Sequence, residues 1–256
     1  MDEAALIEKL QLFGLSRQEA ILYLCLLKET ELTGYEVAKL TGISRSNVYN
    51  GLAALVAHGA AYVLEGTTTR YTAVNIREFC KNRIRYLTEV EEYLVQYSPK
   101  KTLAPEGYIT IEGYRHICDK IHHMLMGAEK RIYFSATGEF LKKWQKEISK
   151  LVEKQIKIVL ISESLPDCFG KEKYEEGIVF YKLSEELMKE SIEADRDKQI
   201  RLIIDSEYVL TGAVYGNRND TCLYSAQRNF VNVFKDAMRN EIELIKILEK
   251  REETKG

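Results

Sequence analysis

The chain has 256 residues, 45% of them hydrophobic and 30% charged, with a formal net charge of −2. This length favours two domains, and the charge counts against a strongly basic nucleic-acid binder. No run approaches the roughly 18 apolar residues of a membrane span, and the acidic start "MDEAALIEKL" lacks the basic region of a signal peptide. Five cysteines without a CxxC pair indicate reduced thiols. We therefore expect a cytoplasmic protein with no membrane partner.

The first 75 residues carry the signals of helices joined by tight turns. Residues 2–13 show helical spacing, and Ser44 begins a helix that runs to about His58. Two Ser/Thr-x-x-Glu capping boxes predict helix starts, and glycines predict helix ends. The boxes are Ser16 with Glu19 and Thr33 with Glu36, and the glycines are Gly14, Gly42 and Gly59.

A hairpin follows these helices. The segments "AAYVLEG" and "TRYTAVN" are strand candidates around a Gly-Thr-Thr turn. Helix, short helix, tight turn, helix and hairpin together predict a winged helix-turn-helix domain over residues 1–75. The alternative is a generic helical bundle with a hairpin.

Residues 76–98 predict one long helix, with apolar residues repeating every seven positions. We expect a short dimerising coiled coil, and the alternative is packing on its own domain. The dimerisation candidates are Cys80, Ile84, Leu87, Val90 and Leu94. The proline-containing segment 99–106 is a predicted linker.

Strand and helix signals alternate over residues 107–256, which predicts an α/β domain. The apolar run "IKIVLI" is typical of a buried parallel strand. We expect helices over 113–126, 137–154 and 229–250, and the last of these is a second candidate for the dimer interface. The overall prediction is an α+β multi-domain protein.

The helix that begins at Ser44 has a polar start that suits DNA recognition. Arginine can bind guanine O6 and N7, asparagine can bind adenine N6 and N7, and hydroxyl groups can bind phosphates. The DNA-binding candidates are Lys39, Ser44, Arg45, Ser46, Asn47, Tyr49, Asn50, Thr68 and Arg70. The alternative is that these side chains only cap and solvate a helix.

The stretch "TGYEVAKLTGISRSNVYNGLAALVAHGAAYVLEGTTTRYTAV" resembles the TrmB-type transcriptional regulators, and the resemblance covers roughly residues 5–97. It implies that the helix from Ser44 is the recognition helix, that hairpin 60–74 is the wing, and that the long helix pairs two subunits. Ala60 and Ala61 depart from the larger apolar residue that is usual there.

Residues 107–256 resemble the phospholipase-D-like domain of shorter TrmB-type members, through "IYFSATGEFLKKW", "IKIVLI" and "KQIRLIIDSEYVLTG". Catalytic phospholipase-D enzymes carry His-x-Lys-x4-Asp followed by glycine. Asp205 and Gly212 match, whereas Lys198 and Ile200 replace the histidine and the lysine. The resemblance therefore implies an effector-binding domain without catalysis. The effector-binding candidates are Ser135, Thr137, Lys198, Asp205, Ser225 and Arg228.

A metal site on the helix 113–126 is an alternative use of its polar residues, since Cys118 and His122 lie four apart. Isoleucines define the buried face of that helix and no outside ligand is evident, so we expect no metal and no cofactor.

The sequence thus predicts a dimeric regulator that binds double-stranded operator DNA and responds to a sugar or sugar phosphate. The rival predictions are a phospholipase-D-type phosphodiesterase or nuclease, and a winged-helix adaptor for protein partners.

Overall fold

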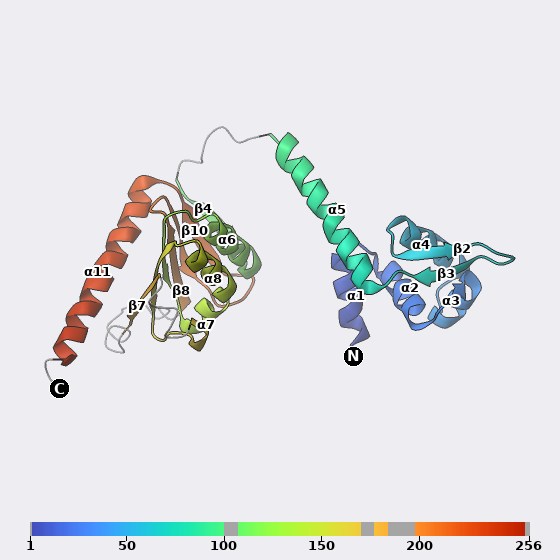
Figure 1. The fold of residues 1–256 in the computed structure, drawn as a ribbon, viewed down its shortest axis with the longest axis horizontal. Helices are drawn as coiled ribbons and strands as arrows, with labels where there is room; N and C mark the ends of the chain where they lie inside the picture. The colour runs from blue at the N-terminus through green and yellow to red at the C-terminus, as the bar shows by residue number, and fades with distance from the viewer. Residues whose placement is uncertain (1, 100–106, 170–176, 184–197, 254–256) are drawn as a thin grey trace. The chain divides into compact units, whose positions relative to one another are not determined.

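The computed structural model describes residues 2–99, 107–169, 177–183 and 198–253. The chain divides into two compact units, residues 1–100 and 101–256, which are considered separately (Figure 1). Among the described helices, none is both long and apolar enough to cross a lipid bilayer.

The N-terminal unit is a winged helix-turn-helix, as the sequence predicts. Its three-stranded antiparallel sheet has the order β1-β3-β2. The helices are α1 (Glu3–Leu12), α2 (Arg17–Lys28), α3 (Gly34–Thr41), α4 (Arg45–Ala57) and α5 (Ile76–Tyr97), and the strands are β1 (Leu32–Thr33), β2 (Ala61–Leu64) and β3 (Arg70–Ala73). Both predicted capping boxes are present, and Gly42 ends α3 with a left-handed φ of 71°.

A compact core ties α5 to the helix-turn-helix. The buried Tyr23 of α2 donates a 2.8 Å hydrogen bond from its hydroxyl to the carbonyl of Val74, and its ring lies 5.5 Å from that of Phe79 on α5. Arg83 also turns toward the core, because its guanidinium lies beside Gly14. This contact attaches α5 to the loop after α1.

The C-terminal unit is a seven-stranded mixed sheet with the order β4-β10-β9-β8-β5-β6-β7. Strands β5, β6 and β7 run parallel, which confirms the parallel strand predicted from "IKIVLI". The strands are β4 (Ile109–Glu112), β5 (Arg131–Ser135), β6 (Lys157–Ser162), β7 (Ile178–Lys182), β8 (Gln199–Ile204), β9 (Tyr208–Ala213) and β10 (Thr221–Ser225).

Helices cover both faces of this sheet (Figure 1). Helices α6 to α8 pack on one face, over a core that includes Ile121, Ile148 and Leu202, while α11 packs on the other through residues such as Met238. The helices are α6 (Tyr114–Met126), α7 (Gly138–Lys142), α8 (Gln145–Glu153) and α11 (Arg228–Glu253), and a 3-10 turn covers Asp167–Phe169.

Two sequence predictions differ from this architecture. The helix predicted over 137–154 is two helices, because the chain turns at Lys143 and Trp144 and the Trp144 side chain packs into the core. Strand β10 was not predicted, since its apolar signal is short, yet it pairs with both β4 and β9. Tertiary packing decides both features.

Gly212, which the sequence matches to the phospholipase-D pattern, has a packing role. Strands β9 and β10 approach so closely there that an added Cβ would lie 2.8 Å from the Cα of Cys222 and against the carbonyl of Thr221. Both obstacles are backbone, so they cannot rotate away as a flexible side chain would.

We therefore expect Gly212→Ala to lower the free energy of unfolding by about 1–3 kcal/mol, as measured by urea denaturation. Gly127→Ala is the matched control, because Gly127 ends α6 with a φ of −87° and an added Cβ there would meet its nearest atom at 3.4 Å. Equal stability of the two variants would contradict the packing role.

Candidate functional site

The N-terminal end of α4 presents a polar, exposed surface. Val48, Leu52 and Leu55 face the core with no exposed area, which directs the intervening side chains outward. The predicted DNA-binding residues are all exposed in the structure: Lys39, Ser44, Arg45, Ser46, Asn47, Tyr49, Asn50, Thr68 and Arg70. Ser44 occupies the N-cap position, but its side chain makes no capping hydrogen bond, contrary to the capping role predicted for it.

Helix α3 fixes two of these side chains. The guanidinium carbon of Arg45 lies 4.6 Å from the centre of the Tyr35 ring, a cation–π contact. Tyr49 lies against Gly34, where an added Cβ would be 2.8 Å from its Cζ. Tyr35 is 53% exposed and was not among the sequence candidates. Its signal in the sequence is weak, because a tyrosine on α3 meets Arg45 only when the two helices cross.

Arg70 lies at the start of β3 and faces acidic neighbours. One of its nitrogens, Nη1, is 4.0 Å from the carboxylate of Glu36 and donates a 3.5 Å hydrogen bond to the carbonyl of Glu31. Backbone and side-chain hydrogen bonds from Thr33 hold the pKa of Glu36 below its ordinary value, with a smaller contribution from Arg70. Exposed pairs of this kind contribute little to stability, so Arg70 can exchange Glu36 for another anion.

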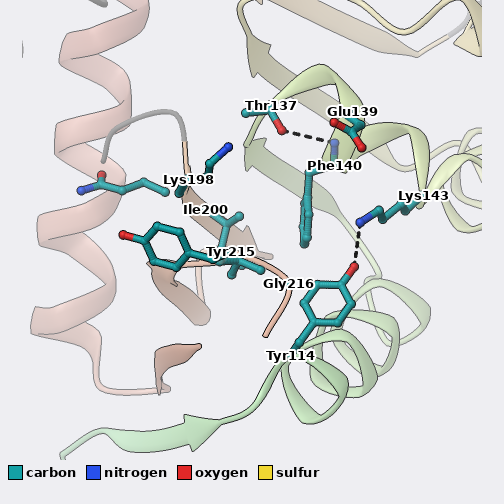
Figure 2. A pocket seen from close by; sticks show the side chains of 11 residues that line it. Tyr114, Thr137, Glu139, Phe140, Lys143, Lys198, Ile200, Tyr215 and Gly216 are labelled. Atoms are coloured by element: carbon teal, nitrogen blue, oxygen red, sulfur yellow. Dashed lines mark hydrogen bonds between the residues drawn. The ribbon is translucent and has the colours of Figure 1, made fainter. Parts of the chain in front are cut away.

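The C-terminal unit contains a pocket of about 130 Å³. Figure 2 shows it between α6, α7, the start of β8 and the loop after β9. Two effector candidates, Thr137 and Lys198, line it. The other lining residues are Tyr114, Glu139, Phe140, Lys143, Gln199, Ile200, Val214, Tyr215 and Gly216.

The structure does not bring the other four effector candidates to this pocket, which corrects the sequence prediction. Ser135 is buried on the opposite face of the sheet, where it accepts a 3.2 Å hydrogen bond from Arg201. Asp205 follows β8 at the end away from Lys198, about 20 Å along the strand. Ser225 ends β10 and Arg228 begins α11 just after it. Because β10 runs in the same direction as β8, both residues lie at that far edge as well.

Asp205 instead anchors a loop. Its carboxylate accepts hydrogen bonds of 2.8 to 2.9 Å from the backbone N–H groups of Glu129, Lys130 and Arg131. It has a positive φ of 54° in the turn between β8 and β9. The matched aspartate is therefore explained by backbone anchoring and not by ligand binding.

Among the described residues, no group of three His, Cys, Asp or Glu side chains is arranged to hold a metal. His122 lies 3.0 Å from the carboxylate of Glu147 on α8. Cys118 is partly buried, and burial raises the pKa of its thiol, with small contributions from its neighbours. His122 and Cys118 of α6 therefore have a structural explanation, since His122 contacts α8 and Cys118 is partly buried.

Residues 10–77 match the family model described as "Sugar-specific transcriptional regulator TrmB". These residues form a TrmB-type domain. The matched segment extends from α1 to the first turn of α5 and so contains the whole of α4 and its exposed polar start.

Two relatives match over part of their length. YrhO of Bacillus subtilis, an uncharacterized protein, is 29% identical over 161 residues, which are 61% of this chain and 58% of YrhO. The HTH-type sugar sensing transcriptional regulator TrmBL1 of Pyrococcus furiosus is 30% identical over 148 residues, 55% of this chain and 43% of TrmBL1. The chain thus spans about half the length of these relatives.

Solved structures show distant likeness. The match to TrmBL2, an archaeal chromatin protein, covers 95% of this chain and 99% of the TrmBL2 chain, with 21% sequence identity and a TM-score of 0.44. The match to NucT from Helicobacter pylori covers 54% of this chain and 96% of the NucT chain, with 12% sequence identity and a TM-score of 0.42. Since both TM-scores lie below 0.5, no functional conclusion follows from them.

The anchoring role of Asp205 has a pH signature. Burial by itself raises the pKa of the Asp205 carboxyl. The three backbone N–H donors together lower the pKa by more than burial raises it, so the pKa lies below its ordinary value. A carboxylate of this kind stabilises the fold fully above the unfolded pKa of about 3.9, and that contribution is lost as pH falls through the folded pKa.

We expect Asp205→Asn to lower the free energy of unfolding by about 1–3 kcal/mol at pH 7, with the difference from wild type shrinking below about pH 4. Urea denaturation from pH 7 to pH 2.5 measures this. Asp236→Asn is the control, because Asp236 is exposed on α11 and forms a surface ion pair with the exposed Arg239. A deficit that stays constant at low pH would contradict the carboxylate anchor.

Proposed function

We propose that this protein is a sequence-specific, DNA-binding transcription regulator that acts as a homodimer and is controlled by a small molecule. The observation that carries the proposal is the exposed polar start of α4 within a TrmB-type domain. The similarity to TrmBL1, an HTH-type sugar sensing transcriptional regulator, supports the same class of function.

In this proposal α4 enters the major groove. Arg45, Asn47 and Asn50 have the donors and acceptors that distinguish base edges, and their positions near the helix start are those that reach the bases in helix-turn-helix proteins. The hydroxyls of Ser44, Ser46 and Tyr49 bind phosphates and set the register. Tyr35 is a positioning residue, because its ring restricts the guanidinium of Arg45 before DNA arrives.

The low net charge implies modest, salt-sensitive affinity. Lys39 and Arg45 are exposed on the helix-turn-helix, and Arg70 is exposed in the wing, where it pairs with Leu64 next to the hairpin turn. Arg70 reaches a phosphate by leaving Glu36, an exchange between two anions that costs little. A dimer doubles the number of phosphate contacts and steepens the salt dependence.

We further propose that the C-terminal unit binds a ligand without catalysing its reaction. Phosphodiester chemistry of the phospholipase-D type uses a histidine nucleophile and a partner lysine. Lys198 occupies the first position, and the buried Ile200 occupies the second. Hydrolysis of a generic phosphodiester by the purified protein would contradict this proposal.

The exposed apolar side of α5 supports the proposed dimer. Ile84, Leu87 and Leu94 are 47% to 54% exposed, although isolated surface helices seldom present such a row to water. Only the first turns of α5 pack on the TrmB-type core, through Phe79, Cys80 and Arg83. A second copy of α5 would cover the remaining apolar side.

DNA recognition through Arg45 gives the first test. If Arg45 binds a guanine, Arg45→Ala should cost about 1–3 kcal/mol of binding free energy and relax preference at one base. Tyr35→Ala should cost about 0.5–1 kcal/mol in the wild type and nothing in the Arg45→Ala background, whereas Tyr35→Phe should behave like wild type. Gel shifts on the DNA upstream of the protein's own gene measure the wild type and these four variants.

Arg17→Ala is the matched charge control. Glu19, two residues later, lies 3.8 Å from His58, so Arg17 is near the far end of α4, about 20 Å from Arg45. An Arg45→Ala protein that is folded and binds with unchanged affinity and base preference would exclude Arg45 from recognition. Failure of the wild type to shift this DNA would favour the adaptor alternative.

Dimerisation through α5 gives the second test. Leu87→Glu would bury a charge in the seam, so we expect a monomer of 29.6 kDa by light scattering at micromolar concentration, against twice that mass for wild type. Asn82→Glu adds the same charge at an outward heptad position and should remain dimeric. A monomeric wild type would contradict the dimer.

A further inference from the structure

The pocket of the C-terminal unit combines an apolar floor with charged groups at its rim. Phe140, Ile200 and Val214 are at most 8% exposed and form the floor. Lys143 and Lys198 are exposed, and in Figure 2 their amino groups lie on either side of Phe140. Among the described residues that line the pocket, Glu139 carries the one carboxylate, so the two ammonium groups give this described lining a net positive charge.

Buried polar contacts hold the walls of the pocket in place. The carboxylate of Asp220, 1% exposed, accepts hydrogen bonds of 3.0, 2.8 and 3.2 Å from the N–H groups of Tyr215, Gly216 and Asn217. The N–H of Val214 donates a 2.8 Å hydrogen bond to the carbonyl of Lys198. The wall after β9 and the start of β8 are therefore fixed to each other, so a ligand meets a largely preformed site.

Lys143 is held at the rim by aromatic neighbours. Its ammonium donates a 2.8 Å hydrogen bond to the hydroxyl of Tyr114, and it lies 5.2 Å from the ring centre of Tyr114 and 5.6 Å from that of Phe140. The Tyr114 hydrogen bond raises the pKa of Lys143, which keeps the group charged at neutral pH. Lys143 lies outside the phospholipase-D motif, and the sequence prediction of the pocket did not include it.

We propose that this pocket binds a small organic anion, with its phosphate or carboxylate group between the ammonium groups of Lys143 and Lys198. The proposal deepens the effector site proposed above by naming its ligand class. Lysine ammonium groups supply charge-assisted hydrogen bonds to such anions. The hydroxyl of Thr137 and the carboxylate of Glu139 are available to hydroxyl groups of the same ligand. The volume of about 130 Å³ restricts the ligand to a few carbon atoms beside the anionic group.

Three probes of similar size distinguish a phosphate, a carboxylate and an uncharged ligand: glycerol 3-phosphate, glycerate and glycerol. Isothermal titration calorimetry on the full chain, without DNA, measures binding, and a thermal shift provides an independent readout. We expect heat of binding and a raised Tm with at least one of the anions and neither with glycerol. The stronger of the two anions identifies the headgroup as phosphate or carboxylate.

Charge-removing variants locate the site. Lys143→Gln and Lys198→Gln should each weaken binding of the stronger anion by about tenfold or more, the loss of one charge-assisted hydrogen bond. Lys142→Gln is the matched control, because Lys142 is exposed on α7 beside Lys143 but does not line the pocket. It should bind like wild type. The Tm of each variant without ligand establishes that it is folded.

Equal responses to glycerol and to the anions would overturn the proposal, as would the absence of any response to either anion. Equal weakening in the Lys142→Gln control would overturn it too, because the anion would then bind the general surface charge. Since no DNA is present, these outcomes are independent of the gel shifts. A protein that binds the anion but no operator would retain the pocket and lose the proposed regulatory function.

Discussion

The side chains of strand β8 pack against helices on both faces of the C-terminal sheet, and much of that unit depends on this constraint. Its even-numbered residues, such as Leu202, enter the core under α6 to α8, while its odd-numbered residues face α11. Arg201 is one of the latter, and it forms a 2.6 Å ion pair with Glu241 of α11, with both side chains largely buried. Removing either partner would leave a buried charge unpaired, so this pair fixes α11 on the sheet.

The same strand separates residues with a structural role from residues that line the pocket. The pocket lies at its start, where Lys198 and the loop after β9 are joined by backbone hydrogen bonds. The hairpin at its other end is fixed by Asp205, whose carboxylate satisfies three backbone N–H groups of the loop before β5. Asp220 does the same for the loop after β9. Two buried or half-buried carboxylates thus organise the backbone of these two loops.

In the N-terminal unit, too, packing of one side of an element decides which side chains are exposed on its other side. The core side of α4 is buried against α2 and α3, and that burial turns its polar start outward. Helix α3 then restricts the outward side chains, because Tyr35 lies under Arg45 and Gly34 leaves room for Tyr49. Restricting a side chain before binding lowers the entropy that complex formation costs. The proposed recognition surface is therefore shaped by two helices, although its base-contacting residues all lie on one.

The sequence by itself determined the elements whose signals are local. Capping boxes, the left-handed Gly42 and the apolar spacing of α4 depend on residues within a few positions of each other, and they predicted helices of the N-terminal unit. The apolar run "IKIVLI" is a local signal of the same kind, and it predicted strand β6 of the second unit. Tertiary structure decided which residues meet. Asp205 and Lys198 are seven residues apart in one motif, yet an extended strand holds them at opposite edges of the sheet. Lys143, by contrast, lines the same pocket as Lys198 from the turn after α7, which is distant in the chain. Strand direction and helix crossing set those distances, and neither leaves a local signal in the sequence.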